Sequence, residues 1–184
     1  MTPTEDLVDE HKAIKLGLRI LEAISGKLDA GEEVEAQDLG QMVEFIKVFA
    51  DKCHHGKEED LLFPAMEQVG VAREGGPIGV MLSQHAMGRA YVRAMGEAVA
   101  KYAAGDRSAA SAIAENARAY VALLSGHIDK EDNILYPMAD ARLSPQAQQE
   151  LTQGFARVER EVVGPGKHEE FHELLHRLEH AYLQ

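Results

Sequence analysis

Hydrophobic positions recur at helical spacing along most of the chain. In the first run, inward-facing positions recur at three- and four-residue steps, at Leu7, His11, Ile14, Leu18 and Leu21. Such a period gives a helix one apolar face. No stretch alternates apolar and polar residues with a period of two, so we expect no strand. The predicted helical runs cover residues 4–26, 35–66, 77–104, 107–139, 145–162 and 167–183.

Turn-forming residues separate these runs. Thr4 is the expected N-cap of the first helix, and Gly26 lies near its end. Ser144 followed by Pro145 marks a new helix start. Four long helices with short connections predict an all-α, up-down-up-down four-helix bundle with two additional C-terminal helices. We assign residues 1–140 to the bundle and 141–184 to a helical extension packed on it.

Composition narrows the function classes. The chain has 184 residues, 19 Lys and Arg against 31 Asp and Glu, and a net charge of −12. Such an acidic chain is not expected to bind nucleic acid or an anionic membrane. One cysteine excludes a disulfide framework, and no signal peptide or membrane-spanning run is visible. We therefore expect a cytoplasmic protein.

An internal repeat selects candidate ligands. Residues 54–64 read HHGKEEDLLFP, and residues 127–137 read HIDKEDNILYP. In both segments a histidine precedes a glutamate by four residues, and each segment is preceded by another histidine about 42 residues upstream. Two matched helical hairpins would place these groups in one layer of the bundle. The candidate metal ligands are His11, His54, Glu58, His85, His127 and Glu131.

The spacing has a direct chemical meaning. Residues four apart lie on the same face of a helix, so an imidazole and a carboxylate can reach one metal together. Nitrogen and oxygen ligands without thiolate suit iron, manganese or zinc, and a carboxylate that bridges two metals favours non-haem iron. Buried carboxylates also need a cation or hydrogen bonds.

One ambiguity concerns the adjacent histidine. His55 and Glu59 have the same spacing as His54 and Glu58. The repeat places Ile128 opposite His55, and on an ideal helix the His55 face is polar. We therefore predict that His54 points inward and that His55 lies beside the ligands or is exposed. On this interpretation, His55→Ala leaves the metal content nearly intact.

The motifs resemble those of the hemerythrin-like (HHE cation-binding) family over about residues 5–139. They are Glu10-His11-Lys12, His54-x3-Glu58, Gln84-His85 and His127-x3-Glu131. The resemblance implies a four-helix bundle around two iron ions with an oxo or hydroxo bridge. Glu58 and Glu131 would link the metals, and one coordination position would stay open. Zinc or manganese could replace iron in this ligand set.

The sequence also departs from the oxygen-carrying hemerythrins. They have a further histidine four residues after the third-helix histidine, where this chain has Arg89. Both Glu131 and Asp132 follow His127, so the choice of carboxylate is open, although the repeat favours Glu131. A set of four histidines and two carboxylates is more similar to bacterial iron–sulfur repair and nitric-oxide-response relatives, whose short cysteine-containing N-terminal domain is absent here.

The expected function is binding of a small ligand, O2, NO or peroxide, for sensing or detoxification. Two alternatives share the same ligands: iron storage, donation or sensing without turnover, and a peroxide- or NO-consuming oxidoreductase. The sequence does not decide whether the protein is an enzyme.

Four further features remain, and three of them have two interpretations each. Arg89 either binds an anionic ligand or bridging carboxylate, or pairs with a surface acid. Tyr120 either supplies a hydroxyl to the site or packs in the core, and Cys53 is expected to be inert packing. The histidines of the last helix are expected to form a solvated or packing face rather than a second metal site; they are His168, His172, His176 and His180.

Overall fold

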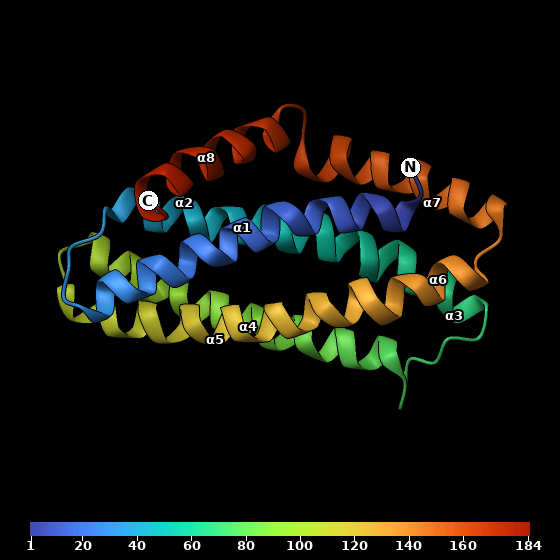
Figure 1. The fold of residues 1–184 in the computed structure, drawn as a ribbon, viewed down its shortest axis with the longest axis horizontal. Helices are drawn as coiled ribbons and strands as arrows, with labels where there is room; N and C mark the ends of the chain where they lie inside the picture. Colours follow the sequence, from blue (N-terminus) through green and yellow to red (C-terminus); the bar gives the residue numbers. More distant parts are fainter.

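The computed structural model describes residues 1–184, and all its regular structure is helical (Figure 1). The α-helices are α1 (Pro3–Asp29), α2 (Ala36–Phe45), α3 (Phe63–Gln68), α4 (Pro77–Ala103), α5 (Ala110–Lys130), α6 (Tyr136–Arg142), α7 (Pro145–Val158) and α8 (Lys167–Tyr182). Four segments are π-helical: η1 (Ile46–His55), η2 (Glu58–Leu62), η4 (Glu131–Leu135) and η5 (Glu159–Val163). A short 3₁₀ turn, η3 (Arg107–Ala109), precedes α5. The prediction of an all-helical chain without strands is confirmed.

Four long rods form the body of the molecule. Two of them are the helices α1 and α4. The second rod runs through α2, η1, η2 and α3, and the fourth through α5, η4 and α6. The rods lie side by side, with the most extensive packing between α4 and α5 and between α1 and α5 (Figure 1). Each rod therefore contributes one inner face to a shared core.

The first helix begins and ends differently from the prediction. Thr2, not Thr4, is the N-cap, and it forms a capping box with Glu5. Thr4 is buried and donates a hydrogen bond to Asp140 over 2.6 Å. The helix continues past Gly26 to Asp29, and the chain turns at Gly31, whose φ of 76° is readily accessible only to glycine.

The π-helical segments change which side chains face inward. In a π-helix the hydrogen bonds join residues five apart, so a turn holds more residues than in an α-helix. In η1 both members of two such pairs are buried, Phe49 with His54 and Ala50 with His55. The second rod therefore directs two adjacent histidines toward the bundle interior.

A layer of polar side chains separates two apolar clusters. The larger cluster includes Ile24, Phe45 and Ile113, and the smaller includes Leu7 and Phe63. In every rod the polar positions lie between residues of the two clusters. The layer consists of His11, His54, His55, Glu58, His85, His127 and Glu131.

The C-terminal helices pack against the bundle. Phe171 and Leu175 of α8 join the larger apolar cluster, and Leu151 and Phe155 of α7 join the smaller. Figure 1 shows α7 and α8 along the side of the bundle that carries α1. Both apolar clusters therefore extend into the last 40 residues. The division of the chain at residue 140 stays a prediction.

A buried lysine connects α7 and η5 to the residues that border the polar layer. Lys57 is fully buried, and its Nζ donates to Asp6 over 3.1 Å, to Glu159 over 2.7 Å and to Glu10. It also lies 5.3 Å from the centre of the Phe155 ring. These acids raise the pKa of Lys57 despite its burial. The charge is therefore held by carboxylates from two separate parts of the chain.

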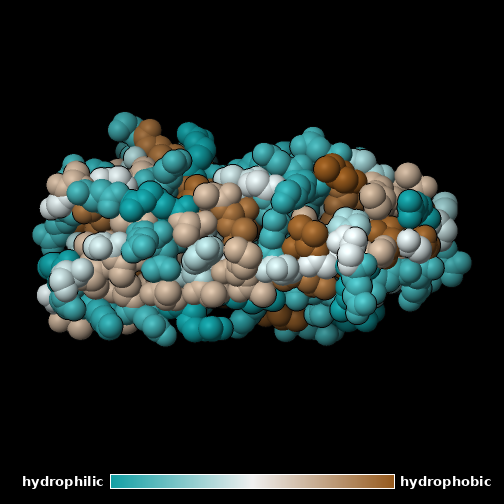
Figure 2. Space-filling model, turned by 90° about the horizontal axis from the view of Figure 1, so that it is seen from below, coloured by the Kyte–Doolittle hydropathy of each residue, from teal (hydrophilic) through white to brown (hydrophobic).

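The surface is largely hydrophilic on the face seen in Figure 2, where hydrophobic side chains occur in groups interrupted by polar ones. None of the helices combines the length and the hydropathy that are needed to cross a bilayer.

The lysine gives a stability prediction with a matched control. Lys57→Met should lower the free energy of unfolding by about 3–5 kcal/mol, because it leaves the buried carboxylate of Glu10 without its cation. Lys130, the equivalent residue of the repeat, is exposed, so Lys130→Met should change stability little. Urea denaturation of both variants measures the difference. Equal effects would contradict the buried cluster.

Candidate metal centre

Five histidines and two glutamates meet in the polar layer. Each histidine is at most 4% exposed, and both glutamates are fully buried. Their ligand atoms form two groups in which all atoms lie within 4.8 Å of one another. The first group is His11, His54 and Glu131, and the second is His55, Glu58, His85 and His127. The structure thus brings all six sequence-predicted residues together and adds His55.

His55 corrects the sequence interpretation. It is 4% exposed, and its ring stacks on His85 with the centroids 3.8 Å apart. The exposed polar face expected for it does not exist, because η1 is π-helical and turns His55 inward beside His54. Burial, together with the nearby His85, lowers the pKa of His55 to about 3, which keeps its ring neutral. A neutral imidazole is the form that binds metals.

Every one of these histidines has a hydrogen-bond acceptor on Nδ1. Such a partner fixes the ring orientation and leaves Nε2 available as a metal ligand. For four of the rings, Nε2 also lies within 4.0 Å of Glu58 or Glu131. The pairs are His11 with Asp132 (2.6 Å), His54 with Glu10 (2.7 Å), His55 with Asp51 (3.3 Å), His85 with Glu59 (2.8 Å) and His127 with Gln84 (2.9 Å).

These acceptors follow the sequence repeat. Glu10 and Gln84 occupy equivalent places, one residue before His11 and His85, and each binds a histidine of the next rod. Glu59 and Asp132 occupy equivalent places one residue after the two central glutamates. Each of them binds the histidine on the first helix of the other half: Asp132 binds His11, and Glu59 binds His85. The two halves therefore hold each other's imidazoles in place.

The two glutamates lie between the groups. Glu131 has Oε1 at 2.8 Å from Nε2 of His127 and Oε2 at 3.2 Å from Nε2 of His11. Glu58 has Oε2 at 3.3 Å from Nε2 of His85 and at 4.0 Å from Nε2 of His54. Each carboxylate therefore reaches imidazoles of both groups, as a ligand that bridges two ions must.

Asp132 lies outside this centre. It is 20% exposed, accepts from His11 Nδ1, and pairs with Lys15 over 3.0 Å. Of the two carboxylates that follow His127, only Glu131 faces the interior. The structure agrees here with the choice that the repeat favours.

The donor set fits metal cations. Glu58 Oε2 and Glu131 Oε1 are buried and receive no hydrogen bond, which is costly for a carboxylate oxygen. Burial and the charge of Glu58 raise the pKa of Glu131 to about 8, whereas neighbouring imidazoles outweigh burial at Glu58 and hold its pKa well below the usual range. Divalent cations among these atoms would supply the missing partners.

Tyr136 is a site residue that the sequence interpretation missed. Its hydroxyl donates to Glu58 Oε1 over 2.6 Å and lies 3.4 Å from both Glu131 Oε2 and His11 Nε2. It reaches this place because η4 is π-helical, so that Tyr136 follows Glu131 by one π-turn. Burial and the two glutamates raise its pKa well above the usual range, so the hydroxyl keeps its proton.

The repeat contained the signal for both additional residues. His55 is matched by Ile128, and Tyr136 is matched by Phe63, which stacks on His85 as Tyr136 stacks on His11. These are positions at which the two halves differ chemically. A departure from the repeat therefore marks where the two groups of candidate ligands become unequal.

Arg89 organises two of the histidine partners. Its Nε donates to both oxygens of Asp51, over 2.9 and 3.1 Å, and it also binds Glu59. These two carboxylates hold His55 and His85. Arg89 is thus paired with acids, as one of its two interpretations proposed, but those acids belong to the site.

The remaining candidates lie outside the centre. Cys53 is buried beside His168, with 3.6 Å between Sγ and Nε2, and burial raises the pKa of its thiol to about 12. Together with Glu10 these two form a small cluster, but Glu10 is already bound by His54 and Lys57. The other three histidines of α8 are exposed: His172, His176 and His180.

The position of His55 predicts a mutational effect. His55→Ala should reduce the metal content from about two ions per chain toward one, because the second group loses one of three imidazoles. Elemental analysis after iron loading measures this. His172→Ala, an exposed histidine on α8, is the control and should keep full content. An unchanged metal content in His55→Ala would restore the interpretation from sequence, in which His54 is a ligand and the adjacent His55 is not.

The metal-free protein should lose stability on acidification. Burial lowers the pKa of both His55 and His127 to about 3, so between about pH 6.5 and 5 the unfolded chain binds up to two more protons at these residues. Glu131 and His85, whose pKa values are raised to about 8 and about 9, bind more protons in the folded state and offset part of this. The net loss is roughly 1–2 kcal/mol.

Urea denaturation of chelator-treated protein at both pH values tests this dependence, which should be weaker in His127→Gln. A gain of stability on acidification would contradict the neutral state assigned to the rings of His55 and His127.

Comparison with known proteins places this geometry in a family. Residues 2–139 match the model of the hemerythrin HHE cation binding domain. Uncharacterized protein Mb2018 of Mycobacterium bovis and uncharacterized proteins MT2051 and Rv1995 of Mycobacterium tuberculosis are each 29% identical to the chain over 137 residues. This match covers 74% of the chain and 53% of each relative, so the chain spans about half the length of these curated relatives. Because the family model covers most of the chain, the protein belongs to the hemerythrin HHE cation-binding domain family.

Proposed function

We propose that the protein is a non-haem diiron protein that binds O2, NO or peroxide for sensing or detoxification. One observation carries the proposal: five imidazoles with occupied Nδ1 atoms surround two buried carboxylates, each of which has one oxygen without a hydrogen bond. The proposal includes the up-down-up-down bundle of residues 1–140, an oxo or hydroxo bridge, and a cytoplasmic location without nucleic-acid or membrane partners.

The ligands divide unequally between two metal positions. His55, His85 and His127 would hold one ion, and His11 and His54 the other, with Glu58 and Glu131 shared. The position held by His11 and His54 has one imidazole fewer, because Ile128 stands where the repeat would place a partner for His55. Fewer protein ligands leave room for a small ligand at that position.

Iron bound here would supply the electrons and the binding position for the small ligand. The chain supplies the remaining chemistry. Tyr136 keeps its proton and donates a hydrogen bond to Glu58, and its hydroxyl lies 3.4 Å from Nε2 of His11, which belongs to the group with fewer imidazoles. Burial of all seven candidate ligands limits the access of water to the centre.

The function is tested by rapid mixing of the ferrous protein with O2, NO and H2O2 under optical monitoring. A reversible spectral change supports binding, and steady peroxide or NO consumption supports an oxidoreductase. A ferrous protein with two irons that reacts with none of the three would contradict the proposal and support iron handling.

Tyr136 makes a separate prediction. Tyr136→Phe should retain both metals but change the affinity for NO about 2–10-fold, the usual contribution of one neutral hydrogen bond. Equilibrium titration of the ferrous variant with NO measures the change, and Tyr91→Phe, a half-buried tyrosine on α4, is the control. An affinity equal to that of the unmodified protein would remove Tyr136 from the ligand position.

A further inference from the structure

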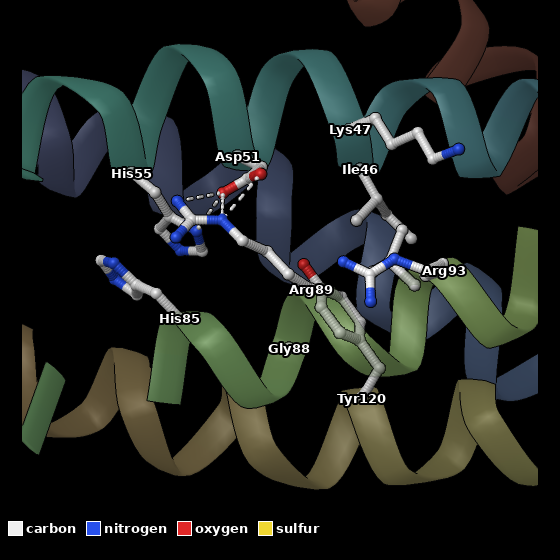
Figure 3. A pocket seen from close by; sticks show the side chains of 10 residues that line it. Ile46, Lys47, Asp51, His55, His85, Gly88, Arg89, Arg93 and Tyr120 are labelled. Carbon is white, nitrogen blue, oxygen red and sulfur yellow. Dashed lines mark hydrogen bonds and ion pairs between the residues drawn. The ribbon is translucent and has the colours of Figure 1, made fainter. Parts of the chain in front are cut away.

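A cavity of about 270 Å³ lies beside the metal centre, between η1, α4 and α5 (Figure 3). Its inner end is formed by His55 and His85. The cavity is also lined by side chains that play no part in the candidate ligand set, notably Arg93 and Tyr120. A molecule bound in the cavity would therefore lie beside His55 and His85 and would also contact residues outside the candidate metal centre.

The cavity carries a surplus of positive charge. Three cations line it, Lys47, Arg89 and Arg93, against one acid, Asp51. Asp51 is already bound by Arg89 and by His55, whereas Lys47 and Arg93 form no ion pair. On a chain with a net charge of −12, such a site is an exception. It favours an anionic occupant.

Tyr120 provides an independent sign of a ligand. The residue is only 2% exposed, and its hydroxyl makes no hydrogen bond in the structure. Figure 3 shows this hydroxyl directed into the space between Arg89 and Arg93. The protein does not use this donor, and its oxygen is open to the cavity, so the hydroxyl is available to an acceptor bound there. Burial also raises its pKa, so the hydroxyl remains a donor.

We propose that this cavity binds a small monovalent oxyanion, a carboxylate or an inorganic ion such as nitrite. The guanidinium of Arg93 matches two oxygens of such an anion, and the Tyr120 hydroxyl donates to it. Because Arg89 is engaged by Asp51 and Glu59, Lys47 and Arg93 are the cations that remain for the anion. The cavity corresponds to about nine water volumes and therefore admits an anion of modest size.

Calorimetric titration with sodium nitrite, sodium benzoate and sodium sulfate tests the site, on the protein as purified and after chelator treatment. The anion should bind in both states. Arg93→Gln should weaken binding about tenfold or more, as expected for a charge-assisted hydrogen bond, and Tyr120→Phe about 2–10-fold. Arg107→Gln, a surface residue that pairs with Glu33, is the control and should bind normally.

The outcomes separate this proposal from the proposed function. Tighter binding of nitrite indicates an inorganic ligand, and tighter binding of benzoate an organic carboxylate; both support the site. Absence of binding, tighter binding of sulfate, or equal affinity in Arg93→Gln would overturn it. Binding that requires the metal and ignores Arg93 would also overturn it, while leaving the diiron centre intact.

Discussion

The burial of two carboxylates and five imidazoles in one layer is the constraint on which this structure depends. Ionisable groups at such depth are unfavourable unless each of them has a partner. Hydrogen-bond acceptors outside the layer satisfy one nitrogen of every imidazole, but Glu58 and Glu131 keep oxygens without donors. Metal cations would complete the set. The two apolar clusters on either side and the Lys57 cluster then serve to hold this layer together.

The internal repeat supplies both the symmetry of the site and its asymmetry. Glu10 and Gln84 each hold a histidine of their own half, and Glu59 and Asp132 each hold a histidine of the other half. The exceptions, His55 and Tyr136, lie near the centre. His55 adds a third imidazole to one group of candidate ligands, and the Tyr136 hydroxyl donates to Glu58 beside His11 of the other group. Unequal positions are what binding of a small ligand at one metal requires.

The sequence was sufficient to predict the helices and six of the residues in the layer, because both depend on spacing that repeats. It left His55 either beside the ligands or exposed, because the prediction assumed 3.6 residues per turn. Since η1 is π-helical, His55 is instead buried among them. No local pattern announces a π-helix, and the same distortion brings Tyr136 to Glu58. The N-cap was placed two residues late, because both Thr2 and Thr4 suit that role. The partners of Lys57 come from distant parts of the chain, and spacing carries no information about them.

The central claim is that two metal ions share these seven side chains. Anomalous scattering from crystals of the iron-loaded protein tests it most directly. We expect two iron peaks, one among His11, His54 and Glu131 and one among His55, His85 and His127, with both glutamates between them. A single peak, or iron bound elsewhere while this layer stays empty, would contradict the account.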